Sequence, residues 1–151
     1  MANIVKASMI HTDIISSLHS ACFKEFWNEK SISEILKMAG VIGFIISTGN
    51  EKPEGFILLR AMADEAEIIS IGVIPSARKK GLASALLKKS IESAAVRDAT
   101  KIFIEVAKNN KAAIAFYETF GFKIVGKRPG YYKRSIKKED AIIYSLNITN
   151  R

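Results

Sequence analysis

Along the first 62 residues, hydrophobic positions either recur at helical spacing or form short continuous apolar runs typical of strands. An apolar stretch at 4–8 predicts a strand, and Thr12 is a candidate N-cap for a helix whose apolar positions recur at helical spacing as far as Cys22. The tetrad that begins at Ser31 and ends at Glu34 has the form of a capping box and predicts a second helix, which ends near Gly40. Apolar runs at 41–47 and 55–62 flank the turn sequence G-N-E-K-P-E-G and predict a β-hairpin.

The remaining pattern predicts strands at 66–74, 101–106, 122–127 and 141–148, and helices at 82–91 and 110–121. The element order is therefore β-α-α-β-β-β-α-β-α-β-β. Hairpins make neighbouring strands antiparallel, whereas the helix before residue 101 is a crossover that makes one pair parallel. We predict an α+β fold in three α/β/α layers, in which about four helices flank a mixed, mostly antiparallel sheet of about seven strands.

Composition narrows the class of protein. The 151 residues are 48% hydrophobic and 25% charged, as in soluble globular proteins, and predict a single domain over residues 1–151. With Cys22 as the only cysteine and two histidines, the chain has no intrachain disulfide, and we expect no metal site. No apolar run approaches the ~20 residues of a membrane span, and the N-terminus lacks a signal-peptide pattern. We therefore expect a cytoplasmic protein that does not bind a membrane.

Charge is divided unevenly between the two halves of the chain. Residues 1–75 carry 6 Lys/Arg and 9 Asp/Glu, whereas residues 76–151 carry 17 Lys/Arg and 6 Asp/Glu. The basic half could attract a nucleic acid, the ribosome or a phosphorylated cofactor, or it could serve solubility alone. A recognisable phosphate site inside that half would distinguish these alternatives.

The segment from Val73 to Ser84 is such a candidate, because it joins a predicted strand to a predicted helix. A helix N-terminus presents unpaired N–H groups to a phosphate, and Gly81 lets the backbone approach it closely. Arg78, Lys79 and Lys80 add positive charge at the rim. The segment has neither the Walker spacing nor the G-x-G-x-x-G spacing, so by itself it is equally compatible with an ordinary charged loop.

Two motifs resemble those of a known superfamily. R-K-K-G-L-A at 78–83 is similar to the R/Q-x-x-G-x-G/A loop of the GCN5-related N-acetyltransferases (GNAT), and N-x-x-A-x-x-F-Y-x-x-x-G-F begins 29 residues after Gly81. Because both occur in order and in the expected context, the chain is identified as a member over about residues 4–147. The resemblance implies the GNAT fold and acetyl-CoA as the cofactor.

The resemblance also implies which residues contact acetyl-CoA. Loop amides would hold the pyrophosphate, the strand before the loop would pair with the pantetheine amides, and Asn110 would both cap its helix and hold the pantetheine arm. A glycine inside a strand, here Gly72, suggests a bulge or the close approach of another backbone. The implied set is Ile71, Gly72, Val73, Arg78, Lys79, Lys80, Gly81, Leu82, Ala83, Ser84, Asn110 and Phe116.

Within the superfamily, I-E-V before the second motif and G-Y-Y-K…K-E-D-A-I-I-Y after it resemble the RimI-type ribosomal-protein alanine N-acetyltransferases. This likeness implies that the acceptor partner is a protein N-terminus, such as that of a ribosomal protein, and not DNA. Tyr131 and Tyr132 would border the acceptor, or would only stabilise a hairpin. Ala107 and Gly130 depart from the RimI pattern, which usually has Arg and Asn at these positions.

Glu105 and Tyr117 are the candidate catalytic residues. The resemblance places the general base at Glu105, although a glutamate on the solvated face of its strand would look the same in sequence. Tyr117 lies two helical turns after Asn110 and is the candidate acid, or else a core aromatic beside Phe116. One carboxylate suffices for an α-amine, since its pKa of about 7.7–8.0 lies well below the value of about 10.4 for lysine.

We predict an acetyl-CoA-dependent N-acetyltransferase that acts on a protein N-terminus. The alternatives are a GNAT enzyme for a small amine or a lysine side chain, and a non-catalytic module that docks on RNA or the ribosome. Among the other residues, we expect Cys22 to be buried and His11 and His19 to lie at the surface or on a helix without a role. Trp27 and Phe26 either border the cleft or, as we favour, pack in the core.

Overall fold

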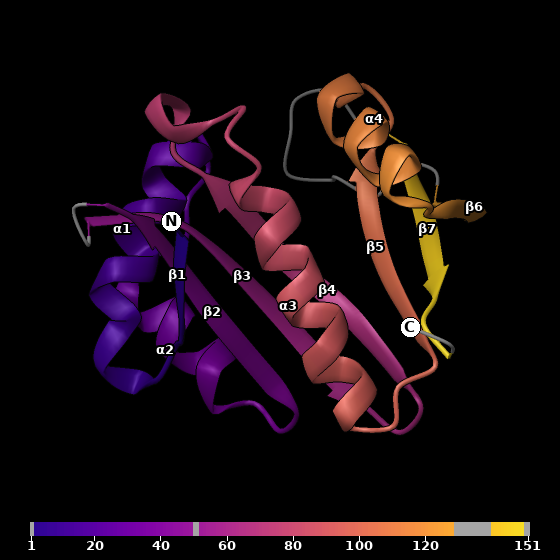
Figure 1. The fold of residues 1–151 in the computed structure, drawn as a ribbon, viewed down its shortest axis with the longest axis horizontal. Coiled ribbons are helices and arrows are strands. Elements are labelled where there is room, and N and C mark those ends of the chain that lie inside the picture. The colour runs from indigo at the N-terminus through magenta and orange to yellow at the C-terminus, as the bar shows by residue number, and fades with distance from the viewer. Residues whose placement is uncertain (1, 50–51, 129–139, 150–151) are drawn as a thin grey trace.

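Seven strands form one mixed sheet in the order β1-β2-β3-β4-β5-β7-β6 (Figure 1). The computed structural model of the protein describes residues 2–49, 52–128 and 140–149. The strands are β1 (Ala2–Lys6), β2 (Val41–Thr48), β3 (Lys52–Met62), β4 (Glu65–Val73), β5 (Lys101–Ala107), β6 (Lys123–Arg128) and β7 (Ala141–Asn147). The helices are α1 (Thr12–Cys22), α2 (Glu29–Lys37), α3 (Leu82–Val96) and α4 (Lys111–Phe120), with short 3-10 turns at Met9–His11 and Pro75–Ala77.

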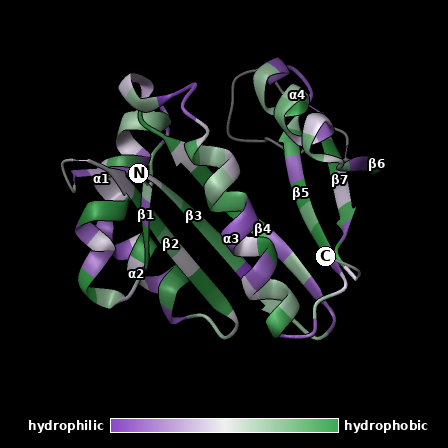
Figure 2. Cartoon of the chain, in the orientation of Figure 1, coloured by the Kyte–Doolittle hydropathy of each residue, from purple (hydrophilic) through white to green (hydrophobic). Residues whose placement is uncertain are grey.

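Strand alternation sends side chains into two separate cores. On β3, Phe56 and Leu58 pack with α1 and α2, while Ile57 and Leu59 pack with α3 and α4 on the other face. All four side chains are fully buried. Figure 2 shows that the strands between the helical layers are largely hydrophobic. The predicted element order and three-layer α+β fold are confirmed.

The start of α2 differs from the prediction. The helix begins at Glu29, and the Asn28 side chain caps it by accepting a hydrogen bond of 2.9 Å from the Ser31 N–H. The predicted capping box at Ser31 is wrong, because the cap and the helix start lie three residues earlier, at Asn28 and Glu29, and the buried Ile32 lies within the helix. The helix ends at Lys37, three residues before Gly40. Gly40 lies beside Ala61 of β3, where the two backbones come so close that only glycine fits. A Cβ at Gly40 would lie 2.1 Å from the Ala61 carbonyl oxygen.

Two other boundaries are set locally. Thr12 is the first residue of α1 and not its cap, since a 3-10 turn precedes it. Asn110 caps α4 as predicted, because its side-chain oxygen accepts a hydrogen bond of 3.2 Å from the Ala113 N–H. Gly121 ends that helix in the left-handed conformation, with φ of 111°.

The parallel pair β4–β5 is short, and this opens the sheet. Only Glu65–Glu67 pair with Lys101–Phe103, after which the two strands have no further paired residues. A register shift in β3–β4, between Leu58 and Leu59, displaces β4 just beyond this point. The C-terminal halves of β4 and β5 therefore diverge, and the space between them becomes available for a site.

Within the described residues, no helix has the length and apolar character needed to cross a membrane. In the same parts of the chain, no three His, Cys, Asp or Glu side chains come together as ligands for a metal ion.

Candidate active site

A cleft of about 400 Å³ lies between the diverging strands β4 and β5. One wall comes from β4 and from α1 with the segment after it, and the other comes from β5 and α4. Its lining is His19, Phe23, Glu25, Trp27, Ile69, Ser70, Ile71, Ile104, Glu105, Val106, Ala107, Asn110, Ala113 and Tyr117. The cleft thus brings together four predicted site residues, the first and last of which are 46 positions apart in the sequence. They are Ile71, Glu105, Asn110 and Tyr117.

Glu105 reaches the cleft because of its position on β5. Alternate residues of this strand, Ile102, Ile104 and Val106, are buried in the core shared with α3 and α4. Glu105 points to the opposite face and is half-buried, with Ile143 of β7 as its cross-strand neighbour. A half-buried carboxylate in the wall of a cleft is well placed to accept a proton from a bound amine, directly or through water.

Tyr117 comes to the same cleft from α4. Its ring makes edge contacts with Phe116 and Phe122, at centroid distances of 5.1 and 5.3 Å, and only 3% of the residue is exposed. Burial raises the pKa of its phenol above the usual value of 10, so the hydroxyl keeps its proton at neutral pH. The side chain packs as a core aromatic and also lines the cleft, so its packing is compatible with the predicted role as the acid.

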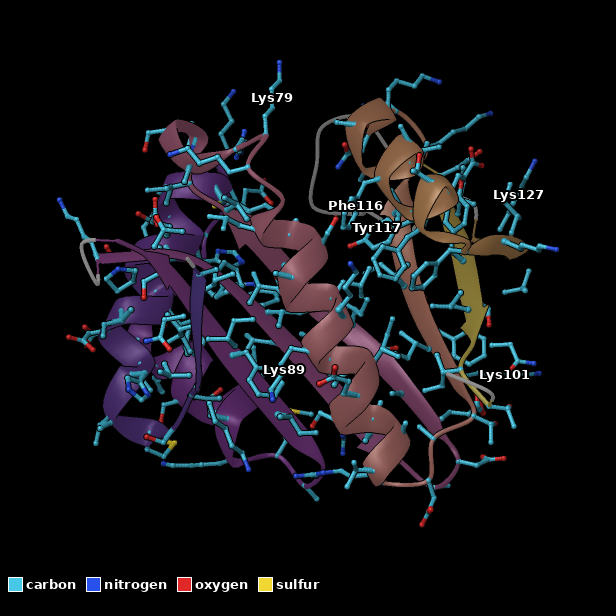
Figure 3. All side chains as sticks on the ribbon, viewed as in Figure 1. Lys79, Lys89, Lys101, Phe116, Tyr117 and Lys127 are labelled. Atoms are coloured by element: carbon cyan, nitrogen blue, oxygen red, sulfur yellow. The ribbon has the colours of Figure 1, made fainter. Side chains whose placement is uncertain are left out.

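A second pocket, of about 220 Å³, contains most of the predicted phosphate loop. It is lined by Val73, Ala77, Arg78, Lys79, Gly81, Leu82, Ala83, Ser84 and Phe116. Figure 3 shows Lys79 at the loop before α3, and Phe116 and Tyr117 on α4. Because Ile71 lines the cleft and Val73 lines this pocket, β4 runs along both of them.

The backbone at Gly81 suits an anion. Gly81 has φ of 79° and precedes the first turn of α3, so it supplies no side chain to cap the N–H groups there. A Cβ built on Gly81 would meet no atom within 4 Å, which means that the space in front of this backbone is open. The first turn of α3 has no acidic residue. These features fit the pyrophosphate of coenzyme A, with Lys79 adding positive charge.

Three of the predicted cofactor residues have other contacts. The Arg78 Nε–H donates a hydrogen bond of 2.8 Å to the Val73 carbonyl, so its guanidinium braces the loop as well as lining the pocket. Lys80 is exposed and interacts with Glu54 of β3 instead of lining either pocket. Gly72 also lines neither pocket. A Cβ there would lie 2.9 Å from Cys22 Sγ, so the closest group at this glycine is a side chain of α1, where the sequence suggested a bulge or another backbone.

The α1 wall of the cleft holds residues to which the sequence analysis gave no role. His19 lies on a helix, which is one of the two expected positions, and its side chain is buried, with only 3% of the residue exposed. Trp27 both packs on the core and lines the cleft, whereas Phe26 is 53% exposed and is not a core residue. Cys22 is half-buried, and burial raises the pKa of its thiol despite a hydrogen bond with Arg78. Tyr131 and Tyr132 lie outside the described residues.

The cleft carries negative charge in a strongly basic protein. The chain has a net charge of +8, yet the charged side chains among the described lining residues are Glu25 and Glu105, with neither Lys nor Arg. The phosphate loop next to the cleft has the opposite sign, through Arg78 and Lys79. An anionic ligand is therefore favoured at the loop, and a cationic one in the cleft.

Comparison with known proteins identifies a family and relatives for this chain. The acetyltransferase (GNAT) family matches residues 12–122. Over 102 residues, the chain is 37% identical to the ribosomal protein bS18-alanine N-acetyltransferase of Escherichia coli strain K12, which covers 68% of this chain and 69% of that protein.

Solved structures give the same likeness in three dimensions. The crystal structure of the ribosomal-protein-S18-alanine N-acetyltransferase from Escherichia coli superposes with a TM-score of 0.90 and 28% identity, over 100% of this chain and 96% of the other. Arabidopsis thaliana NAA60 in complex with acetyl-CoA superposes with a TM-score of 0.83 and 15% identity, over 99% and 100% of the two chains, which is a likeness of fold.

Proposed function

The chain belongs to the acetyltransferase (GNAT) family and is an acetyl-CoA-dependent N-acetyltransferase, and from this premise we propose that it acetylates the α-amino group at a protein N-terminus. We further propose that the acceptor is the N-terminal alanine of a ribosomal protein. The support for the second step is the similarity to the bS18-alanine N-acetyltransferase of Escherichia coli.

One structural observation carries the first step. A carboxylate from β5, Glu105, and a phenol from α4, Tyr117, line the same cleft. Acetyl transfer to an amine needs a group that takes a proton from the amine and a group that gives one to the leaving sulfur. We assign the first role to Glu105 and the second to Tyr117.

A single carboxylate as the base favours an α-amine over a lysine side chain as the acceptor. At neutral pH an α-amino group is close to its pKa of about 7.7–8.0, whereas a lysine amine, with a pKa of about 10.4, costs roughly 3.4 kcal/mol more to deprotonate. Glu25 and Glu105 attract the ammonium form of the acceptor into the cleft before it loses its proton.

The second pocket and the strand beside it offer contacts for parts of coenzyme A. We propose that Gly81 and the first residues of α3 hold its pyrophosphate, and that β4 at 71–73 and Asn110 hold the pantetheine arm. When bound, acetyl-CoA supplies the acetyl thioester. Phe116 lines this pocket and Tyr117 the cleft, so consecutive residues of α4 belong to the two substrate sites.

The experiment that tests the acceptor is a panel assayed for thiol release and for acetylated product by mass spectrometry. It contains peptides that begin with Ala, Ser, Gly or Met, a peptide with a blocked N-terminus and an internal lysine, and small primary amines. We expect turnover of the free N-termini, with Ala first. Preferential turnover of the lysine peptide or of a small amine would contradict the proposal and favour the alternative acceptor.

Gly81 provides a direct prediction about the coenzyme A site. The Gly81→Val variant is expected to bind acetyl-CoA at least tenfold more weakly by calorimetry, which is about 1.4 kcal/mol. The added side chain occupies the open space in front of the α3 amides, and φ of 79° disfavours any branched residue.

Gly49 is the matched control for this variant. It also has positive φ, 36°, and an open space at Cβ, but it lies in the turn after β2 and lines neither pocket. Gly49→Val should cost stability without changing the affinity for acetyl-CoA. Equal affinities for the wild type and Gly81→Val would show that the pyrophosphate is held elsewhere.

A further inference from the structure

The segment between α1 and α2 is attached to α1 through both backbone groups of one residue, Trp27. The Trp27 N–H donates a hydrogen bond of 3.1 Å to Nδ1 of His19, and the Trp27 carbonyl accepts one of 2.9 Å from the Ser16 hydroxyl. Ser16 and His19 are three residues apart on α1, so they lie on the same face of the helix. Both side chains are buried, and together with Trp27 they form what we call the Trp27 clamp.

Ring contacts fix the indole as well as the backbone. The imidazole of His19 stacks on the indole of Trp27, with centroids 4.5 Å apart and planes inclined by 20°. Phe23 and Phe56 surround the same imidazole at 4.5 and 5.8 Å. Since both His19 and Trp27 line the cleft, the clamp determines the shape of the wall that faces Glu105 and Tyr117.

The hydrogen bond also determines the protonation state of His19. Nδ1 accepts from an amide only when it carries no proton, so the ring is neutral with its proton on Nε2. Protonation of Nδ1 would place two donors against each other. Burial lowers the pKa of His19 below its usual 6.5, which keeps the ring neutral at physiological pH.

Other ionisable groups near this ring act in different directions. Glu25, Glu105 and Tyr117 share the cleft with His19, and the two carboxylates favour a protonated imidazole. On α1, Cys22 lies three residues further along and is hydrogen-bonded to Arg78, whose positive charge opposes protonation. The packed faces of β3 and β4 contribute Phe56 and Ser70, which do not titrate. The pKa of His19 is nevertheless lowered, and the cause is burial of the ring.

We propose that Ser16 and His19 are positioning residues for the acceptor, because they hold Trp27 as one wall of the acceptor site, and that peptide binding requires the neutral form of His19. The inference rests on the proposed function, since it places the peptide in this cleft. We expect the clamp to affect peptide binding more than acetyl-CoA binding, because its residues do not line the second pocket.

Two substitutions of His19 separate the hydrogen bond from the ring stacking. His19→Asn keeps an acceptor oxygen near the position of Nδ1 and does not titrate, whereas His19→Phe keeps an aromatic ring and has no acceptor. For an Ala-started peptide at pH 8, we expect His19→Phe to raise KM about tenfold, because the part-buried Trp27 N–H loses its partner. His19→Asn should stay within about threefold of the wild type. KM for acetyl-CoA should change in neither variant.

The pH dependence is read from a peptide that is already acetylated, because it has no α-amine to titrate. Its affinity for the wild type should fall about tenfold as the pH is lowered through the pKa of His19, and the fall should disappear in His19→Asn. Trp27 is the only tryptophan in the chain, so its fluorescence should report the same transition, with a midpoint below pH 6.5.

His11 is the matched control for the titration. It too accepts a backbone hydrogen bond at Nδ1, from the Ser8 N–H at 2.9 Å, but it does not stack on Trp27. His11→Asn should therefore keep the transition in Trp27 fluorescence, and His19→Asn should lose it.

Several results would overturn the inference. A fluorescence transition that persists in His19→Asn would show that another group titrates. Peptide affinity unchanged in His19→Phe, or KM values that rise equally for peptide and acetyl-CoA as the melting temperature falls, would mean that His19 is only a core residue. If the transition is found but the wild type acetylates no peptide, the proposed function fails, and with it the acceptor role, while the titration of His19 stands.

Discussion

The Glu105→Gln variant is expected to lose about 10²–10⁴ in kcat/KM for an Ala-started peptide at neutral pH. Glutamine keeps the size of the side chain and its place in the wall of the cleft, but it cannot take a proton from the acceptor. The melting temperature should change little, since Glu105 is half-buried on a strand whose core side chains, such as Ile104 and Val106, are untouched. Steady-state kinetics with one peptide, together with thermal melts, measure both quantities.

Raising the pH should restore part of the lost rate. The acceptor α-amine deprotonates itself above its pKa of about 7.7–8.0, so the variant should approach the wild type as the pH passes that range. Glu67 is the matched control, because it is an exposed glutamate on β4 that does not line the cleft. Glu67→Gln should keep full activity. A loss of tenfold or less in Glu105→Gln would show that the carboxylate is not the base.

Tyr117→Phe is expected to lower kcat by about 10²-fold, with KM for acetyl-CoA nearly unchanged. This pattern is that of an interaction made only in the transition state, when the leaving sulfur receives its proton. Phenylalanine keeps the edge contacts with Phe116 and Phe122, so stability should change little. Because burial raises the pKa of Tyr117, the wild-type donor stays protonated from neutral to mildly alkaline pH and should not limit activity there.

Tyr144 is the control for this variant, because it is an equally buried tyrosine with a different partner. Its hydroxyl donates a hydrogen bond of 3.0 Å to Glu118, and it does not line the cleft. Tyr144→Phe should lower the melting temperature and keep kcat, whereas Tyr117→Phe should lower kcat and keep the melting temperature. Should Tyr117→Phe instead lose stability with kcat unchanged, Tyr117 is a core aromatic, and Tyr131 and Tyr132 become the next candidates for the acid.

Features stabilised within one helical turn were predictable from the sequence. Asn110 begins and Gly121 ends α4 through contacts that reach no further than five residues. The space in front of the Gly81 backbone is open, as its predicted close approach to an anion requires. The error at Ser31 arose because Asn28 and Ser31 are both residues that cap helices well. The helix that begins after Asn28 is the one observed, and its buried Ile32 packs in the core with α1 and β3.

His19 shows a different kind of limit. Its environment comes from Trp27 eight residues away and from Phe56 on β3, and no periodicity within α1 reveals either contact. A polar residue on a helix is usually exposed, so nothing in the pattern indicated that this ring is buried. Only the packing of α1 against the sheet turns this residue into a buried hydrogen-bond acceptor at the wall of a cleft.

The sequence by itself determined the order of the elements, the three layers and the family, because hydrophobic periodicity and two motifs are properties of neighbouring residues. Only the tertiary structure decided that β4 and β5 separate after three paired positions, and that the resulting cleft brings Glu105 and Tyr117 together with the Trp27 clamp. Strand register depends on packing from both layers at once, so it is not encoded in any single segment of the chain.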